Sequence, residues 1–301
     1  MIKSPLLCSV CFLASVLSPM CAAAEQSPKQ YSPFSISASK IMTGEANVGS
    51  GEQTLQRDSW ILDAKIKQPL NRQWSVGLDL SYADLDYDWQ NVKQPMFDGS
   101  VNTWSALKRY SAGLSVMYRP DKHWMFMMAP KLQYAYADVD GVSSSDAMSY
   151  GVVATGMYRF DDGNMLGFGV AYLNDISDVR TVPYLAVRWQ ITDKLRLGNP
   201  FSAGFSGPAG LELAYKISPT FDIGVGTSKR TQRFLIQDED TTVEVDEWIS
   251  FIRTGWAVTP SINLNAYAGY YFNGEMELSE PELVETIDNQ VAFALAAEYK
   301  F

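Results

Sequence analysis

Cysteine is absent from all but the start of this sequence, since Cys8, Cys11 and Cys21 lie within the first 24 residues. A disulfide framework and a thiolate metal site are therefore excluded for the rest of the chain. Histidine is nearly as scarce, and the only one, His123, follows a Pro-Asp-Lys turn. A base in such a turn cannot serve a nucleophile at the opposite end of the molecule. We therefore expect no enzyme and no cofactor.

Long apolar runs are also lacking. Beyond the start, no segment approaches ~18 consecutive apolar residues, which excludes a transmembrane helix. Residues 1–24 have the pattern of a cleaved secretory signal, with Lys3, an apolar stretch from Leu6 to Leu17 and three alanines before Glu25. Residues 25–33 are polar, and we expect them to form a flexible periplasmic leader.

Positive charge is scarce as well: 24 basic residues stand against 34 acidic ones, a net charge of −10. Removal of the signal takes away Lys3 and leaves −11, which makes nucleic acid an unexpected partner. Aromatic residues, in contrast, make up 13% of the chain. An exported chain that is rich in aromatics and has no apolar helix favours a membrane β-barrel over a periplasmic enzyme.

Segments of alternating polarity recur over residues 34–301. Because side chains alternate between the faces of a strand, this pattern predicts an all-β fold, a transmembrane antiparallel up-and-down β-barrel in the outer membrane. We predict about 14 strands, or 12 if the two least regular segments, 34–43 and 194–201, are dropped. The predicted strands are 34–43, 57–67, 73–87, 105–119, 123–137, 147–160, 164–174, 180–191, 194–201, 208–217, 221–235, 244–258, 261–274 and 287–301.

The predicted connectors alternate in length. Short ones carry Pro, Asp or Ser at turn positions, and longer polar ones lie near 84–104, 138–146, 236–243 and 275–286. Barrels of this class have short periplasmic turns and longer extracellular loops. We therefore expect both chain ends on the periplasmic side.

Aromatic residues recur eight positions apart on one face of several strands. Such pairs are Trp74 and Tyr82, Tyr110 and Tyr118, Tyr150 and Tyr158, and Trp248 and Trp256. Eight residues cover roughly 26 Å along a strand, or ~20 Å of height at a tilt of about 40°. This spacing predicts two aromatic girdles bordering a lipid-facing band.

The last strand alternates strictly, with Val291, Phe293 and Leu295 on one face. It resembles the C-terminal recognition strand of bacterial outer-membrane proteins, with aromatic Tyr299 and terminal Phe301. The resemblance implies that these two residues form an assembly signal for the barrel-assembly machinery. Outer-membrane lipid and lipopolysaccharide are the other expected partners.

The stretch from Gly207 to Pro219, followed by Phe221 to Gly226, reads GPAGLELAYKISP and FDIGVG. It resembles an uncharacterised family of bacterial outer-membrane barrels known only as a domain of unknown function. The resemblance implies a barrel and supplies no catalytic residues.

The inward face of the predicted strands defines the lumen. Its predicted charged residues are Asp63, Lys65, Asp79, Arg109, Lys131, Arg159, Arg188, Glu212, Lys216, Arg253 and Glu298. Both signs occur, so the interior is either a narrow wet pore or a salt-bridged plug. We predict a porin-like passive channel. The alternative is a non-conducting barrel with a structural or surface-interaction role, and an enzyme ranks third.

Carboxylates form the one pattern with metal-binding chemistry. Asp84, Asp86 and Asp88 alternate and so share one face of a strand, just beyond an aromatic girdle. Such oxygen ligands suit Ca²⁺ or Mg²⁺, although a solvated acidic rim explains the same pattern. Further acid lies at Asp238, Glu239 and Asp240, in a predicted extracellular loop.

Overall fold

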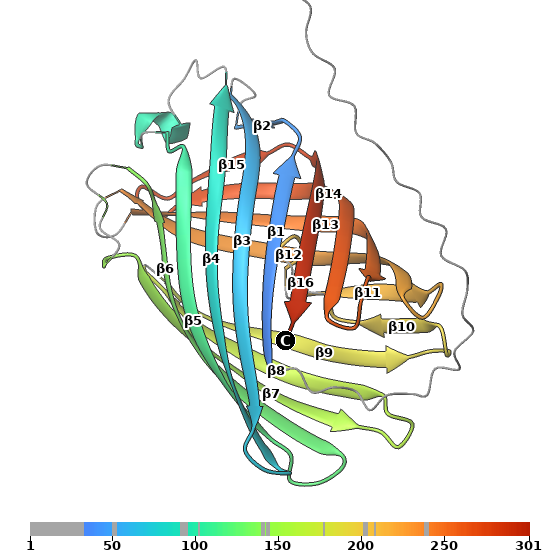
Figure 1. The fold of residues 1–301 in the computed structure, drawn as a ribbon. Helices are drawn as coiled ribbons and strands as arrows, with labels where there is room; N and C mark the ends of the chain where they lie inside the picture. Colours follow the sequence, from blue (N-terminus) through green and yellow to red (C-terminus); the bar gives the residue numbers. More distant parts are fainter. Residues whose placement is uncertain are drawn as a thin grey trace, which may run out of the picture. The chain divides into compact units, whose positions relative to one another are not determined.

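Strands account for nearly all of the computed structural model (Figure 1), which describes residues 33–49, 53–90, 96–101, 103–139, 142, 145–176, 178–200, 204–207, 209–237 and 241–301. A 3-10 turn, η1 (Met96–Gly99), interrupts the strand pattern. No helix in these ranges has the length and apolar character to cross a membrane. The first half of the chain forms β1 (Phe34–Thr43), β2 (Ala46–Val48), β3 (Gln53–Pro69), β4 (Trp74–Gln90), β5 (Ala106–Tyr118), β6 (Trp124–Ala137), β7 (Met148–Arg159) and β8 (Met165–Asp175). The second half forms β9 (Asp178–Gln190), β10 (Leu195–Gly198), β11 (Ala209–Lys216), β12 (Phe221–Gln237), β13 (Thr241–Ala257), β14 (Ile262–Leu278), β15 (Leu283–Ile287) and β16 (Gln290–Lys300).

Fourteen of these strands form a closed antiparallel barrel. Each pairs with its neighbours in sequence, and β1 closes the ring by pairing with both β3 and β16. The short strands β2 and β15 pair with each other through Val48 and Ile287 and extend the wall at one end. The predicted fold class and the strand number of 14 are thus confirmed.

Several strands run further than the sequence predicts. β12 and β13 are each 17 residues long, and only three residues of the sequence separate them. Residues 236–243 were expected to form a loop. β14 and β15 likewise occupy much of the expected loop at 275–286. The reason is that polar residues of the expected loops, such as Thr242, Glu275 and Glu277, continue the strand alternation and pair with the neighbouring strand, so polarity alone does not end a strand here.

The two ends of the barrel differ in their connections. At the end that carries Phe34 and Phe301, which we call the turn end, the connections are short, and side-chain oxygens satisfy backbone N–H groups. Asp121 accepts from the N–H groups of His123 and Trp124, both at 2.7 Å. Such bonds are typical of Asx turns. The opposite end, with the remaining connections, is called the loop end.

The outer face of the barrel is apolar. On β16, Phe293 and Leu295 are exposed to 52% and 62%, while the alternating Ala292 and Ala294 are buried inside. The register places Trp74 beside Tyr118 and Tyr82 beside Tyr110, with ring centroids 4.4 and 4.9 Å apart. Aromatic residues on these two strands therefore form two rows, one at the turn end and one eight residues further along, as lipid-facing girdles do.

The ring narrows toward the loop end, because β10 and β11 stop after four and eight residues. Beyond the loop-end limits of β10 and β11, β12 reaches β6 directly, and Leu235 of β12 pairs in parallel with Tyr136 of β6. This contact closes a smaller circuit through β12, β13, β14, β16, β1, β3, β4, β5 and β6. The interior of the loop-end half is consequently narrower than that of the turn-end half.

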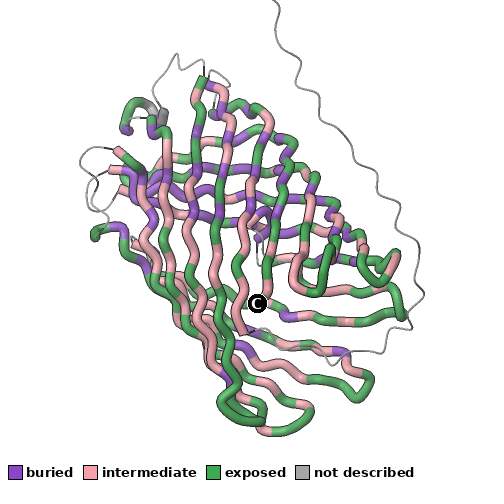
Figure 2. The backbone as a smooth tube through the Cα atoms, in the orientation of Figure 1, coloured by how far each residue is buried: buried purple, intermediate pink, exposed green. Residues whose placement is uncertain are grey.

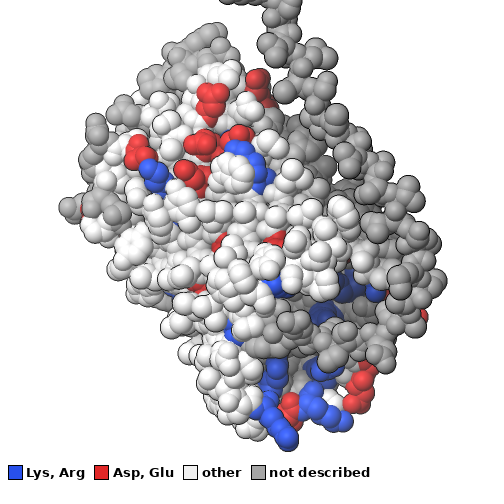
Figure 3. All heavy atoms as spheres, viewed as in Figure 1, with Lys and Arg blue, Asp and Glu red and all other residues white. Residues whose placement is uncertain are grey.

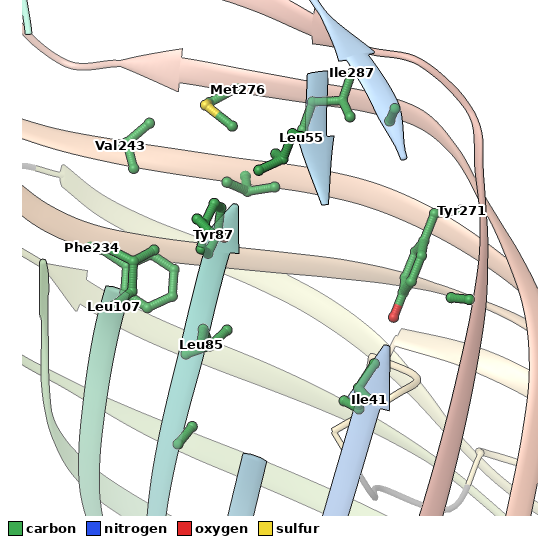
Figure 4. Close-up of a cluster of buried hydrophobic side chains, with 14 of the residues drawn as sticks. Ile41, Leu55, Leu85, Tyr87, Leu107, Phe234, Val243, Tyr271, Met276 and Ile287 are labelled. Carbon is green, nitrogen blue, oxygen red and sulfur yellow. The ribbon is translucent and has the colours of Figure 1, made fainter. Parts of the chain in front are cut away.

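Apolar side chains fill the narrow circuit. Buried residues concentrate in the loop-end half of the strands (Figure 2). They converge on the axis from opposite walls, with Leu85 and Leu107 facing Phe234 (Figure 4). Leu55, Leu107 and Phe234 are each 0% exposed. The loop-end half is therefore packed like the core of a soluble domain.

Candidate functional site

The barrel interior is the candidate site, and its loop-end half holds a desolvated ion pair. Arg57 of β3 donates to both carboxylate oxygens of Glu247 on β13, at 2.5 and 3.0 Å. The two side chains are 7% and 2% exposed. Bidentate geometry of this kind is the arrangement in which Arg and a carboxylate bind most strongly. The pair joins opposite walls of the barrel through its core.

A second guanidinium lies beside this pair. Arg230 of β12 donates to the Tyr271 hydroxyl at 3.0 Å and to the Gln232 side-chain oxygen at 2.9 Å. Both Arg57 and Arg230 lie over the Tyr271 ring, at 5.7 and 5.9 Å from its centroid. Aromatic faces attract cations, and this attraction increases when water is excluded. A polar layer thus crosses the apolar core without bulk solvent.

Residues 204–207, between β10 and β11, lie inside the barrel. Phe205 is 0% exposed, and its ring packs on Tyr267 and Tyr271 with centroids at 5.1 and 5.9 Å. The Tyr271 hydroxyl donates to the Phe205 carbonyl at 3.1 Å. Gly204 has φ of +77°, a conformation that favours glycine, and a Cβ there would displace the end of the Ile61 side chain, whose Cδ1 would lie 2.0 Å away. Residues 204–207 therefore form part of the packed interior of the loop-end half, which we call the plug.

The turn-end half is polar and open by comparison. At its boundary with the core, Arg253 binds Glu212 through Nε and Nη2 at 3.0 and 2.7 Å, and Nη2 also binds Asp222 at 2.5 Å. Further toward the turn end, Lys65 pairs with Asp79 and Lys300 with Glu298. A cavity of about 430 Å³ lies there, lined by residues of β9 to β14, β16 and their turns.

The remaining residues predicted to face the lumen are spread over the wall. Asp63 accepts a hydrogen bond from Ser37 at 3.3 Å. Arg109 makes no hydrogen bond or ion pair within the described ranges, and the ionisable groups that act on it are Arg230, Asp63 and Tyr87. Lys131 is exposed on β6. The structure brings together Glu212 with Arg253 and Lys65 with Asp79, but it does not gather all these charges at one point.

The predicted metal candidates lie on the outer face of β4. Asp84 accepts from the Tyr82 hydroxyl at 3.3 Å, and Asp88 from the Gln90 side chain at 3.2 Å. No three His, Cys, Asp or Glu side chains in the described part of the chain converge as metal ligands. Residues Asp238, Glu239 and Asp240 lie outside the described residues, as do residues 1–32.

The terminal aromatics seal the ring at the turn end. Phe301 donates its N–H to the Phe34 carbonyl at 3.0 Å, and the two rings lie 4.8 Å apart. Tyr299 packs against Phe301 edge to face at 4.6 Å. The two residues predicted as an assembly signal therefore lie at the seam where the last strand meets the first.

Sequence reasoning missed the residues of the plug. Arg57 and Glu247 were absent from the predicted lumen residues, and Phe205 fell between two predicted strands. One signal was present: Val243, Val245 and Ile249 share the inward face of β13 at the loop end, where they are all buried. An inward face that is apolar over several residues indicates a packed interior rather than a wet one.

A family model described as Domain of unknown function (DUF6268) matches residues 36–300. The chain belongs to this family. No curated protein matches this DUF6268 chain.

Solved structures share the fold of this DUF6268 protein. A Pseudomonas aeruginosa FadL homologue is 12% identical, with a TM-score of 0.50 and 89% of each chain covered. The COG4313 outer membrane channel from Pseudomonas putida F1 is 9% identical, with a TM-score of 0.48, over 92% of this chain and 100% of that one. The P. putida toluene transporter TodX is 10% identical, with a TM-score of 0.43, over 89% and 90% of the two chains. The first of these shows the fold of an outer-membrane barrel.

Proposed function

We propose that this protein is a passive outer-membrane channel whose turn-end half is a polar vestibule and whose loop-end half is a constriction. The observation that carries the proposal is the contrast between the faces of the wall. Lipid-facing side chains are apolar, whereas the inner face of the turn-end half surrounds a cavity of about 430 Å³ with charged and amide side chains. A wall of this kind suits a water-filled passage. The likeness to a FadL homologue supports the barrel fold, and transport is an analogy at the level of fold.

The constriction implies that conduction depends on the inward segment 204–207. Phe205 packs against Phe251 of β13 and Tyr267 of β14 inside the barrel, so its removal should open a path. We therefore expect Phe205→Ala to raise the open probability or the conductance of the purified protein in a planar bilayer. Phe293→Ala, on the lipid face, is the matched control and should behave like the parent protein. Equal currents from both variants would mean that segment 204–207 does not limit conduction through the constriction.

The second candidate function is a non-conducting barrel with a structural or surface-interaction role. The observation in its favour is the loop-end core, in which Leu55, Leu107 and Phe234 are as buried as in a soluble domain. Absence of current from the parent protein and from Phe205→Ala would favour this function over a channel.

An enzymatic function has the least support. His123 is held in a turn, with Nδ1 3.0 Å from the Arg159 carbonyl oxygen and its ring stacked on Tyr158 at 5.5 Å. No nucleophile is paired with it in these contacts. The structural relatives described above are a channel, a transporter and a FadL homologue.

The orientation that we propose places the turn end in the periplasm and the loop end toward lipopolysaccharide. A cysteine at Glu282, exposed at the loop end, should react with an impermeant thiol reagent on intact cells. A cysteine at Asp162, exposed at the turn end, should react only after lysis. The reverse labelling would overturn this orientation.

Assembly forms the last part of the proposal, in which Tyr299 and Phe301 are read by the barrel-assembly machinery. Deletion of Phe301 should reduce the fraction of heat-modifiable protein in the membrane. Since Phe301 also closes the seam with Phe34, refolding of the same variant into detergent is the control. Normal refolding with poor insertion in cells supports recognition, whereas unchanged insertion contradicts it.

A further inference from the structure

Four cations lie together at the turn end, on the inner face of β9, β10 and β11 and in the turn that joins β9 to β10. We call Arg188, Lys194, Arg196 and Lys216 the basic cluster. The Lys216 N–H donates to the Lys194 carbonyl at 2.7 Å, so these two residues are directly opposite each other. Arg196 pairs with Gln190 and with Ala214, which places it diagonally to both Arg188 and Lys216. Opposite residues have Cβ atoms roughly 5 Å apart and diagonal ones about 7–8 Å.

These cations form no ion pair with a carboxylate within the described ranges, unlike several other bases of the lumen. Arg57 is paired with Glu247, Arg253 with Glu212, and Lys300 with Glu298. The side chains of the basic cluster make no hydrogen bond or ion pair there, and all four are exposed to the interior. Like charges that face each other across a strand pair are destabilising. A bound anion would offset the repulsion among these four positive charges.

The cluster also lines a concave space. Lys194, Arg196 and Lys216 contribute to the cavity of about 430 Å³ at the turn end. The acids of the same wall are largely engaged, since Asp222 is bound to Arg253 and Glu298 to Lys300 and the Asn263 amide. Asp193, in the turn before Lys194, is the remaining carboxylate. Figure 3 shows Lys and Arg gathered, with some Asp and Glu, around the hollow at the turn end, while Asp and Glu are more frequent toward the loop end.

We propose that the basic cluster binds a small multivalent oxyanion, such as an organic acid with several carboxylates or a phosphate ester. The inference deepens the proposed function, on which it rests for the role of the bound anion as a solute in transit. Arg supplies forked N–H donors that match carboxylate and phosphate oxygens, and Lys supplies point charges. A cavity of this size lies in the range of small-molecule sites.

The test uses the full barrel refolded in detergent and titrated by calorimetry with propane-1,2,3-tricarboxylate, with inorganic pyrophosphate and with glycerol. We expect both anions to bind the parent protein and glycerol to show no heat of binding. The affinity should fall when salt rises from about 0.01 M to about 0.15 M, because the Debye length shortens from about 30 to about 8 Å. If one anion alone binds, it identifies the carboxylate or the phosphate source.

The variant pair Arg196→Gln with Lys216→Gln should weaken anion binding on the order of a hundredfold, since each lost charge-assisted bond is worth about tenfold. The matched control is Arg72→Gln with Arg119→Gln, which removes two positive charges from other turns at the same end and should bind normally. No binding by the parent protein, or an equal loss in both double variants, would overturn the proposal. Anion binding without conductance would support the anion site and contradict the proposed channel. Conductance without anion binding would support the channel and contradict the anion site.

Discussion

The loop-end and turn-end halves of this barrel are built on the same strands but have different interiors. On β3, the inward residues from the loop end are Leu55, Arg57, Ser59 and Ile61, all at most 6% exposed. Further along the same strand, Lys65 is 49% exposed. The alternation of faces is the same throughout, so the difference comes from side-chain size and from the narrower circuit made by β12 and β6. One wall can therefore combine a stabilising core with a polar vestibule.

The two halves also differ in how much the loss of one partner from an ion pair destabilises the protein. The Arg57–Glu247 pair is shielded from water, whereas the Lys65–Asp79 pair has 49% and 45% exposed side chains. Loss of one partner from a buried pair leaves an uncompensated charge in a medium of low dielectric constant. Loss of one partner from an exposed pair leaves a hydrated charge.

The largest effect is expected for Arg57→Ala, which leaves the carboxylate of Glu247 buried in the core without its partner. We expect a loss of about 3–5 kcal/mol in the free energy of unfolding. Reversible urea unfolding in lipid vesicles measures it. The control is Arg57→Ala combined with Glu247→Ala, which should recover part of the loss because no charge is left unpaired. A cost below about 1 kcal/mol for the single variant would mean that water reaches the loop-end core.

A second comparison tests which surfaces are wet. Leu114→Arg places a charge on the lipid face, where Leu114 is 57% exposed, and should cost about 2–4 kcal/mol. Ser115→Arg points into the vestibule and should cost less than about 1 kcal/mol if water fills it. Unfolding in lipid measures both.

A third position links this comparison to the loop-end half. Ser59 is inward like Ser115 but only 5% exposed. Ser59→Arg should therefore resemble Leu114→Arg rather than Ser115→Arg, because a buried, unpaired charge is costly on either side of the wall. Similar costs at Ser59 and Ser115 would abolish the distinction between the halves.

The sequence predicts the wall of this barrel better than its interior, and the reason is physical. Alternation and turn chemistry are local, so the limits of β1 at residues 34–43 and the position of the turn at Asp121 follow from neighbouring residues. The contact between Leu235 and Tyr136 depends on how far the ring tilts and narrows, which involves strands 99 positions apart in the chain. No local pattern contains that information.

The predicted lumen residues illustrate the same limit. Glu212 and Arg253 were both predicted to face inward, but their pairing depends on the register of β11, β12 and β13. Phe205 lies in a segment without strand alternation, and its insertion into the core is decided by contacts with Tyr267 and Tyr271 on β14. Whether the lumen was a pore or a plug could not be decided from charges alone, since the plug is mainly apolar.

The boundary between the halves provides an intermediate prediction. Arg253 binds one buried carboxylate, Glu212 at 4% exposure, and one partly exposed carboxylate, Asp222 at 40%. We expect Glu212→Gln to cost about 1–3 kcal/mol, because a charge-assisted bond is lost in a desolvated place. Asp222→Asn should cost less, since water can replace the lost interaction. Denaturant midpoints of the two variants test this order, and a reversed order would place the boundary nearer the loop end.

The smallest effect is expected for the exposed pair of the vestibule. Lys65 Nζ lies 3.4 Å from Asp79, and both side chains are about half exposed, so their attraction competes with hydration and with the entropy of two mobile side chains. A double-mutant cycle of Lys65→Ala and Asp79→Ala should yield a coupling of about 0.2–1 kcal/mol. This coupling should decrease at about 1 M salt, where the Debye length is ~3 Å, whereas the coupling of Arg57 with Glu247 should change little because salt does not enter the core. A coupling for Lys65 and Asp79 that is large and independent of salt would mean that the vestibule is dry, and the proposed water-filled passage would then be untenable.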